Sequence, residues 1–456
     1  MRPFFSMRVR QISVQKLFGI FDHRIPLKME ERITILHGLN GYGKTVVLQL
    51  LDGLLNGNYA SLRTVPFDKF ELDFDDDSIL TIEKMHQDES SSSEGSKKSK
   101  ARRFITKFTY LRKNASSETF ELDEPKIADR NVDFSATSFT QLLEELKLVG
   151  HTPDIEASKK EFGGRQFEWP TYLLSRSSFS EKARSEPEWL RGIHKALQVH
   201  LIRTQRLSAY TDKSGHPQPL TVQQYSDEIT KRLRDALTQY AARSQELDRT
   251  FPHRLLQSTS PKTSTAAEVR SRFESLEKKR LRLADLGFID PRDHQDLGQQ
   301  QVEEAKLAVL GLYVSDVEEK LAVFDELAAK IELFRDIINA RFQYKKVLIQ
   351  RDKGLVFVTA TGAELPPNAL SSGEQHELVL LYEMLFKVAP NSLILIDEPE
   401  ISLHIAWQNE FLKDLEKVVK LAGFDVLLAT HSPDVIGERW DLTVKLTGPK
   451  DAARVA

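Results

Sequence analysis

The stretch that decides the fold is GLNGYGKT, residues 38–45. The apolar run before it, residues 32–37, predicts a short buried strand, and the leucine-rich run after it, residues 46–55, predicts a helix. A strand, a glycine-rich loop and a helix in this order are the context that a Walker A phosphate-binding loop requires. We therefore predict a phosphate site at residues 38–45.

The residue types within this loop suit the phosphates of a nucleotide. Gly38, Gly41 and Gly43 permit the turns that aim backbone N–H groups at phosphate oxygens. Lys44 is long enough to reach the terminal phosphates, and the hydroxyl of Thr45 is a ligand for Mg²⁺. The predicted nucleotide-binding residues of the loop are Gly38, Asn40, Gly41, Gly43, Lys44 and Thr45.

A second phosphate-binding element is predicted far along the chain, at LSSGEQ, residues 370–375. It precedes an apolar run, residues 376–386, that predicts a helix. A helix N-terminus presents unpaired N–H groups and a partial positive charge, which suits a phosphate. A capped helix with a buried apolar stripe explains the same letters, so the residues alone leave both interpretations open. The predicted contacts are Ser371 and Ser372 as N-cap residues, Gly373 for close approach of the backbone, and Glu374.

A buried strand with an acidic end follows this helix. Residues 392–396 are four aliphatics after a serine, and they lead into Asp397, Glu398, Pro399 and Glu400. Helix, strand and acidic end in this order resemble the signature motif and Walker B strand of ABC-class ATPases. In that class the phosphates held by one subunit's P-loop are capped by the signature helix of the other subunit. The resemblance therefore implies ATP and Mg²⁺ as cofactors and a homodimer or higher homo-oligomer with ATP between its ATPase heads.

The acidic residues and one histidine complete the predicted chemistry. Asp397 would hold Mg²⁺, usually through water, and Glu398 would orient and deprotonate the attacking water. A lone histidine is more often structural, but His431 follows the next buried strand, residues 424–429. In that place it resembles the switch histidine that contacts the γ-phosphate. We predict Glu398 and His431 as catalytic residues and Thr45 and Asp397 as metal ligands.

Within the ABC class, Glu-Pro-Glu followed by Ser402-Leu403-His404 resembles the RecF and OLD-nuclease branch and ATPases of anti-phage defence, such as the Septu and PARIS types. Two features depart from the class: His404 stands where transporters usually place aspartate, and no Q-loop glutamine is identified. OLD nucleases continue into a metal-binding TOPRIM domain, whereas only residues 432–456 follow the predicted switch histidine. We therefore expect no such nuclease in this chain.

The composition is that of a globular protein. The 456 residues, 40% of them hydrophobic, allow two or three domains, and 64 basic against 67 acidic residues give no overall positive field for nucleic acid. The absence of cysteine excludes disulfides, thiolate zinc sites and a cysteine nucleophile. No signal peptide and no apolar run of membrane-spanning length is found, so we expect a soluble, cytoplasmic protein without a membrane partner.

The remaining segments predict an α/β ATPase head with an antiparallel β lobe and a helical or short coiled-coil insertion. Three alternating segments predict antiparallel strands, namely residues 70–74, 79–82 and 104–110. The serine-rich stretch 88–103 ends in basic residues and is interpreted as solvated surface or as a nucleic-acid contact. A strand at 199–206 would bring Arg203 and Arg206 to the ligand edge of the sheet, as phosphate contacts or as surface ion pairs.

The C-terminal half of the chain predicts a change from helix to hairpin. Residues 221–340 are mostly helical, with a 3-4 apolar seam from Tyr313 to Ile338. Residues 347–358 then predict a β-hairpin. The predicted domains are the N-terminal part of the head (1–210, with a variable insert at 125–195), the helical insertion (211–344) and the C-terminal part of the head (345–456).

Four functions follow from these features. The leading hypothesis is an ATP-dependent dimeric switch or sensor that controls a separate effector, a nuclease or toxin, in bacterial anti-phage defence. The alternative is a RecF-like ATP-dependent DNA-binding repair factor. A transporter subunit is disfavoured by the helical insertion, and a non-enzymatic protein that holds ATP as a structural element is the fourth hypothesis.

Overall fold

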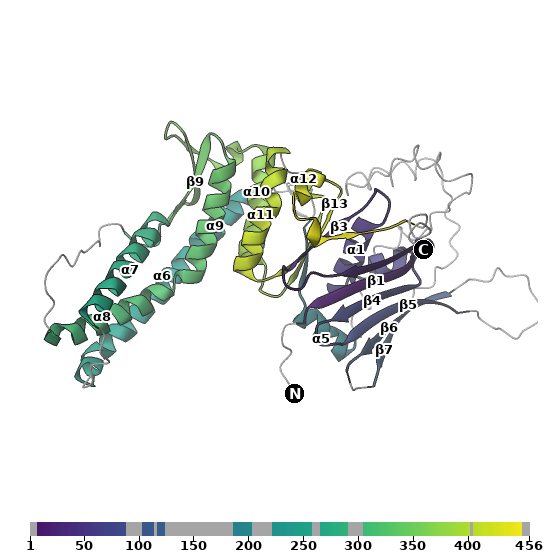
Figure 1. Cartoon of the computed structure of the whole chain (residues 1–456), viewed down its shortest axis with the longest axis horizontal. Helices are drawn as coiled ribbons and strands as arrows, with labels where there is room; N and C mark the ends of the chain where they lie inside the picture. Colours follow the sequence, from purple (N-terminus) through teal and green to yellow (C-terminus); the bar gives the residue numbers. More distant parts are fainter. Residues whose placement is uncertain are drawn as a thin grey trace, which may run out of the picture. The chain divides into compact units, whose positions relative to one another are not determined.

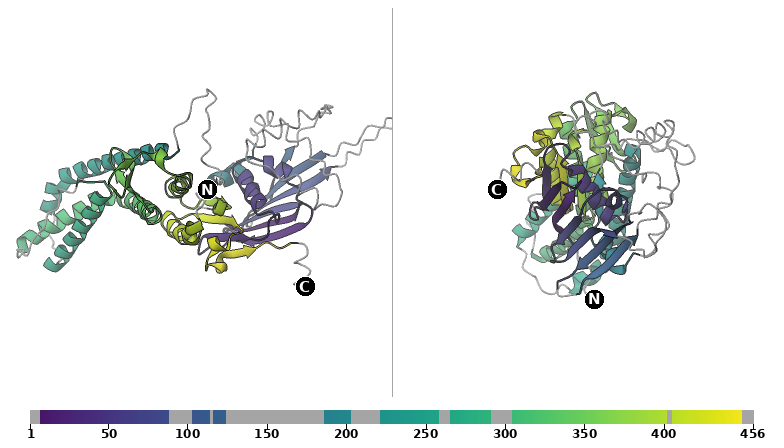
Figure 2. Two further views of the ribbon diagram at one scale, coloured as in Figure 1. Left: turned by 90° about the horizontal axis from the view of Figure 1, so that it is seen from above. Right: turned by 90° about the vertical axis from the view of Figure 1, so that its right-hand side faces the viewer.

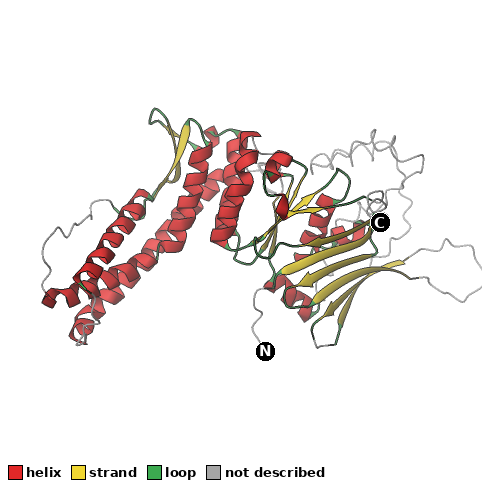
Figure 3. Cartoon of the chain, viewed as in Figure 1, coloured by secondary structure: helices red, strands yellow, loops and turns green. Residues whose placement is uncertain are grey.

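The computed structural model describes residues 7–87, 103–113, 116–123, 186–202, 221–257, 265–290, 304–401 and 405–448. The chain forms two compact units. Unit 1 comprises residues 1–205, 389–401 and 424–456, and unit 2 comprises residues 206–388 and 402–423. Segments distant in the sequence thus share a unit, and the three consecutive domains drawn from the sequence stay a prediction. Unit 1 is rich in strands and unit 2 is mostly helical (Figure 3).

A parallel sheet forms the centre of unit 1. Among the described residues its strands lie in the order β14-β3-β13-β12-β8, and all neighbours pair in parallel. Continuous aliphatic runs such as residues 393–396 form strands buried on both faces. The strands are β3 (Ile33–His37), β8 (Val199–Ile202), β12 (Leu393–Asp397), β13 (Asp425–Thr430) and β14 (Thr443–Lys445).

An antiparallel sheet forms the second layer of unit 1 (Figure 1). Its described strands follow the order β2-β1-β4-β5-β6-β7, and alternating residues such as Phe70 and Leu72 are buried. This confirms the predicted antiparallel lobe, to which β2 and β7 add strands that the sequence pattern did not predict. The strands are β1 (Val9–Leu17), β2 (Phe21–Pro26), β4 (Lys69–Phe74), β5 (Ile79–Gln87), β6 (Arg103–Leu111) and β7 (Glu118–Asp123).

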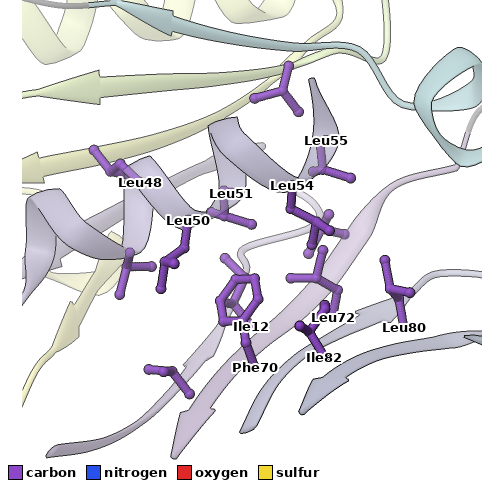
Figure 4. Packing of buried hydrophobic residues seen from close by; sticks show 14 of the residues in the cluster. Ile12, Leu48, Leu50, Leu51, Leu54, Leu55, Phe70, Leu72, Leu80 and Ile82 are labelled. Atoms are coloured by element: carbon purple, nitrogen blue, oxygen red, sulfur yellow. The ribbon is translucent and has the colours of Figure 1, made fainter. Parts of the chain in front are cut away.

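Helix α1 (Lys44–Leu55) packs between the two sheets and begins inside the predicted phosphate loop. Leu50 and Leu54 lie in one apolar cluster with Phe70 and Ile82 of the antiparallel sheet (Figure 4). Each such side chain contributes roughly 1.5–3 kcal/mol when it is fully buried. The core therefore fixes the position at which α1 starts. Unit 1 also contains the helices α2 (Ala60–Thr64), α5 (Glu188–Ala196) and α12 (Pro433–Ile436), and the short 3₁₀ helices η7 (Pro399–Ile401) and η8 (Trp440–Leu442).

Unit 2 is built on long helices, so the predicted helical insertion is confirmed (Figures 1 and 2). The predicted apolar seam is divided between two helices, which meet at Phe324. Val317, Phe324 and Phe334 of that seam are buried, whereas Tyr313 is exposed. Asp325 and Glu326 stand in the first turn of the second helix, where acidic residues favour a helix start. The helices are α6 (Thr221–Gln257), α7 (Ala266–Asp285), α8 (Glu304–Ala322) and α9 (Asp325–Arg341).

The remainder of unit 2 carries the predicted signature helix. The predicted hairpin is confirmed as an antiparallel pair that joins β11 in a small sheet. Helix α10 (Ser372–Tyr382) follows, its apolar residues buried, and it continues into a π-helical turn at Glu383–Lys387. The other elements are β9 (Lys345–Gln350), β10 (Gly354–Thr359), β11 (Glu364–Leu365), η5 (Pro367–Ala369) and α11 (Ile405–Ala422).

Several predicted features fall outside the described residues. These are Arg203 and Arg206, the Ser402-Leu403-His404 stretch, the basic loop up to residue 102 and most of the 125–195 insert. Within the described ranges, no helix is both long enough and apolar enough to cross a membrane.

Candidate nucleotide site

The register of the parallel sheet brings three predicted segments to one edge of unit 1. Asp397 of β12 pairs with Ala429 of β13, and Ala429 pairs with Leu36 of β3. The phosphate loop follows β3, Glu398 follows β12, and His431 follows β13. Ligands of parallel α/β sheets bind at the carboxyl ends of the strands. The sheet thus places all predicted catalytic and metal residues at the edge where a ligand would bind.

The backbone of the loop has the conformation that its glycines permit. Gly41 and Gly43 have φ angles of 86° and 85°, in the left-handed region that other residues seldom adopt. A Cβ atom at Gly43 would also lie only 2.7 Å from Cδ2 of Leu17. Gly38 is buried against Leu446, and Asn40 is exposed at the tip of the loop. Gly43 therefore serves both the turn and the packing of the loop onto β1.

The N-terminus of α1 is open to an anion. Gly43 occupies the N-cap position, and no side chain in the described part of the chain caps the helix there. The first N–H groups of a helix have no partner within the helix and carry partial positive charge. The start of α1 therefore has the features of a phosphate-binding helix end.

Lys44 lies buried within the loop, with only 5% of its surface exposed. Its Nζ donates to the carbonyl oxygens of Gly38 at 2.8 Å and Leu39 at 3.3 Å. Burial lowers the pKa of Lys44, and the nearby carboxylates of Glu398, Glu400 and Asp397 oppose that shift. The ammonium group is thus held beside the acidic end of β12, in the place where it would meet a phosphate.

Thr45 and Asp397 meet directly. The Thr45 hydroxyl donates to Oδ1 of Asp397 at 3.0 Å. Burial raises the pKa of Asp397 to about 6, and the charges of Glu398 and Glu400 add to that shift, while the hydrogen bond from Thr45 opposes it. A hydroxyl and a half-buried carboxylate are hard oxygen ligands of the kind that Mg²⁺ accepts alongside phosphates and water. The donor set therefore fits the predicted metal.

Glu398 has an unusual backbone conformation at the end of β12. Its φ angle is 46°, a region that costs energy for a residue with a side chain. Its N–H donates to the carbonyl of Ala429 at 2.9 Å, which ties the residue to β13. The Glu398 side chain is 31% exposed, so a water molecule can reach the predicted general base.

Glu400, which sequence reasoning did not select, contacts the predicted switch histidine. Its Oε1 lies 3.1 Å from Nδ1 of His431, whereas Oε1 of Glu398 lies 3.9 Å from the same nitrogen. The Thr430 hydroxyl donates to the same Oε1 of Glu400 at 2.8 Å. The second glutamate of the Glu-Pro-Glu run was visible in the sequence, but its pairing with the end of β13 depends on the sheet.

His23 is a second residue that the sequence did not indicate. Its Nε2 lies 2.8 Å from the carbonyl oxygen of Tyr42, and because a carbonyl only accepts, the ring donates there. Burial lowers the pKa of His23. The His23 ring also stacks on Phe21, which contacts the Tyr42 ring in turn. Strand β2 thus supports the phosphate loop from the side of the antiparallel sheet.

The predicted signature residues lie in unit 2, at the start of α10. Ser371 and Glu374 form a reciprocal capping box: the Ser371 hydroxyl accepts from the Glu374 N–H, and the Glu374 carboxylate accepts from the Ser371 N–H. Lys345 also donates to the Glu374 carboxylate, at 2.7 and 3.0 Å. The S-x-x-E spacing was a sequence signal for this box. Ser372 is exposed and Gly373 half-buried.

The fold and the site define a P-loop ATPase, and comparison with known proteins gives the family. The family model described as "AAA ATPase domain" matches residues 7–436, so the chain belongs to that family. A search of curated proteins gives no match.

Solved structures similar to this chain include two heads of SMC proteins. One is the Smc head domain with an extended coiled coil bound to the C-terminal domain of ScpA, from Pyrococcus furiosus, with 12% identity, 98% of each chain covered and a TM-score of 0.34. The other is the SMC head domain from Thermotoga maritima, with 11% identity, 96% of this chain and 95% of the other covered, and a TM-score of 0.32.

Proposed function

We propose that the protein binds ATP and Mg²⁺ at the carboxyl edge of its parallel sheet and hydrolyses the ATP. The observation that supports this best is the contact between Thr45 and Asp397, 3.0 Å apart, beside the buried Lys44. This contact joins the end of β12 to the phosphate loop that follows β3, in the arrangement that Mg²⁺ and nucleotide phosphates need. Bound Mg²⁺ would neutralise charge on the phosphates.

The protein's own residues would then perform the proton chemistry. The N–H groups of α1 and the ammonium of Lys44 would bind the phosphates. Glu398 would orient a water molecule and take its proton at the carboxylate. His431, 3.9 Å from Glu398, would contact the terminal phosphate from the neighbouring strand end.

Replacement of Glu398 tests the proposed hydrolysis. Glu398→Gln should keep nucleotide affinity and slow hydrolysis by roughly 10²–10⁴-fold, the usual contribution of a general base. Binding of a fluorescent ATP analogue and single-turnover hydrolysis separate the two quantities. Glu438→Gln, an exposed substitution in the same unit, is the control and should leave both unchanged. Wild-type hydrolysis by Glu398→Gln would show that the base is misassigned.

We also propose that the complete site forms between two copies of the chain, as the likeness of LSSGEQ to the ABC signature implies. The start of α10 in one copy would cap the phosphates held by α1 of the other. This arrangement uses both helix N-termini, which the same chain supplies in different units.

The output that we propose is control of a separate effector, a nuclease or toxin, in bacterial anti-phage defence. The support is the resemblance of Glu-Pro-Glu and Ser402-Leu403-His404 to that branch. The candidate docking surface is the group of helices α6 to α9, whose residues the proposed ATP chemistry does not use. ATP can shift a partner's binding only if the two states of the head contact that partner unequally.

We expect the effector to be co-encoded, so expression of this chain alone and together with the product of its neighbouring gene tests the proposed output. Each experiment is repeated with Lys44→Ala and with Glu398→Gln. We expect protection from phage only with both genes, and loss or misregulation of it in either variant. Protection or DNA cleavage by the lone chain would contradict the proposal, as would an effector that ignores both substitutions. Salt-dependent DNA binding by the purified protein would instead favour the RecF-like repair function.

A further inference from the structure

We infer that Glu400 is a positioning residue that fixes the ring of His431 through Nδ1. This inference rests on the proposed ATPase function, in which His431 faces the nucleotide. The carboxylate of Glu400 is nearly enclosed, with 8% of its side chain exposed, whereas the His431 side chain is 46% exposed. A buried acceptor thus lies behind an accessible ring.

Three groups from the end of β13 converge on one oxygen of Glu400. Oε1 accepts from the Thr430 hydroxyl at 2.8 Å and from the His431 backbone N–H at 3.1 Å, and it lies 3.1 Å from Nδ1 of His431. The Thr430 hydroxyl oxygen in turn accepts from the N–H of Ser432 at 3.0 Å. The carboxylate therefore orders both the backbone at His431 and its side chain.

The inferred role of Glu400 includes the tautomer of His431. A carboxylate oxygen accepts hydrogen bonds, so a hydrogen bond between the two groups requires the proton to be on Nδ1. The remaining ring nitrogen, Nε2, is then the one available to a ligand. Carboxylates that hold a metal-binding histidine in this way set its ring orientation and proton position, and their loss costs roughly 10–100-fold in metal affinity or activity; we take the same range as a guide for His431.

Glu398 makes this positioning necessary. Its Oε1 is 3.9 Å from the same Nδ1, close enough to attract the ring once Glu400 is removed. A ring that turned toward Glu398 would hydrogen-bond to the proposed general base and reduce its basicity. Glu400 keeps the two groups apart, because its own oxygen is 3.1 Å from Nδ1.

The test compares Glu400→Ala with the conservative Glu400→Gln. Alanine removes the acceptor, so kcat should fall roughly 10–100-fold, while nucleotide affinity stays within about threefold of wild type. Glutamine keeps an acceptor oxygen and should restore part of that loss. In the double variant Glu400→Ala with His431→Ala, kcat should equal that of His431→Ala alone, because Glu400 acts through the ring.

Asp425 provides a matched control for purely structural effects. It lies at the start of β13, the strand whose other end Glu400 contacts; its side chain is 14% exposed, and it accepts from Nε and Nη2 of Arg8 at 2.7 and 2.6 Å. Asp425→Ala should lower thermal stability as Glu400→Ala does, but leave kcat unchanged. Equal losses of kcat in the two variants, or multiplicative losses in the double variant, would overturn the positioning role.

A spectroscopic measurement separates this inference from the proposed function. ¹⁵N chemical shifts of labelled histidine, assigned with His431→Ala, report which ring nitrogen carries the proton. We expect the Nδ1–H form of His431 in the wild type and its loss in Glu400→Ala. An Nε2–H ring in the wild type would overturn the inference even if the protein hydrolyses ATP. The Nδ1–H ring in a protein without ATPase activity would contradict the proposed function alone.

Discussion

Helices α1 and α10 both begin at residues predicted to bind phosphate, yet their N-termini are built in opposite ways. Helix α1 starts after Gly43, and no described side chain caps it. Helix α10 starts after Ser371, whose hydroxyl and N–H are both engaged with Glu374. The first N–H groups of α1 thus have no side-chain cap among the described residues, whereas in α10 the capping box satisfies the N–H groups of Ser371 and Glu374.

The carboxylates near the two helix ends also differ, because the pKa of one is raised and that of the other is lowered. The pKa of Asp397, beside α1, is raised to about 6, mainly by burial. Burial also acts to raise the pKa of Glu374, but hydrogen bonds from Lys345 and Ser371 outweigh it and lower that pKa. Lys44 acts on Asp397 only from a distance and lowers its pKa less than burial raises it, whereas Lys345 hydrogen-bonds directly to Glu374. This difference supports the proposal that α1 holds the nucleotide first and that α10 of another copy then meets the nucleotide already bound.

The largest expected effect is on nucleotide affinity, and it should differ between the two lysines beside these helices. Lys44→Ala removes the ammonium at the start of α1, and nucleotide affinity should fall by at least about 100-fold, because charge-assisted hydrogen bonds contribute roughly 1.5–3 kcal/mol each. Lys345→Ala is the matched control at α10 and should leave that affinity unchanged. Isothermal titration with an ATP analogue measures both. Equal losses in the two variants would show that the helix ends do not differ in the way proposed.

A smaller effect is expected when the two helix ends are tested together. Ser372→Arg places a bulky cation at the start of α10 and should weaken ATP-dependent association by roughly 10–100-fold, since each lost contact contributes about 1.5–3 kcal/mol. A mixture of Lys44→Ala and Ser372→Arg chains contains heterodimers with one intact composite site. ATPase activity should return on mixing, to about half the wild-type value per heterodimer. No recovery in confirmed heterodimers would contradict the composite site.

The stability of the nucleotide-free protein should respond with opposite signs at the two carboxylates. The folded pKa of Asp397 lies above its ordinary value of 3.8, so its contribution to stability is present below pH 3.8 and lost as the pH rises through about 6. The folded pKa of Glu374 lies below 4.5, so its contribution is present above pH 4.5 and lost as the pH falls through the lowered pKa.

At pH 7.5, Asp397→Asn should therefore stabilise the nucleotide-free protein and Glu374→Gln should destabilise it, each by about 1 kcal/mol. Thermal unfolding at pH 7.5 and at acidic pH measures both changes, and both should diminish at the acidic pH. Destabilisation by Asp397→Asn at pH 7.5 would show that Asp397 is satisfied without a cation.

Local patterns predicted the elements of this site, and long-range register decided its contacts. The Gly38–Thr45 loop and the acidic end of β12 could be recognised because their residues are consecutive in the sequence. The contact between Glu400 and His431 joins segments that only the parallel pairing of β12 with β13 brings together. No local sequence pattern indicates that Glu400 and His431 lie close together.

Other features depended on packing rather than pattern. The bond from His23 to Tyr42 depends on the β1–β2 hairpin lying beside the loop, and a buried histidine has no distinctive sequence signal. The seam from Tyr313 to Ile338 keeps its 3-4 spacing across the turn at Phe324, so periodicity alone could not locate the break between α8 and α9. The capping box at Ser371 was locally encoded and could have been found.

The smallest expected effect concerns charge at the start of α10. If this helix end meets the phosphates of a nucleotide bound by another copy, the charge of Glu374 opposes the encounter and that of Lys345 favours it. Glu374→Gln should then strengthen ATP-dependent association by roughly two- to fivefold, and Lys345→Ala should weaken it by a similar factor, because charges with partial solvent exposure contribute only about 0.2–1 kcal/mol. Both substitutions break the same ion pair, so both should slightly lower thermal stability. Sedimentation at low and high salt measures association, and unfolding measures stability. If α10 faces an anion, the two substitutions should change association in opposite directions while both lower thermal stability. If both substitutions change association in the same direction, Glu374 and Lys345 serve only as a helix cap and its counterion.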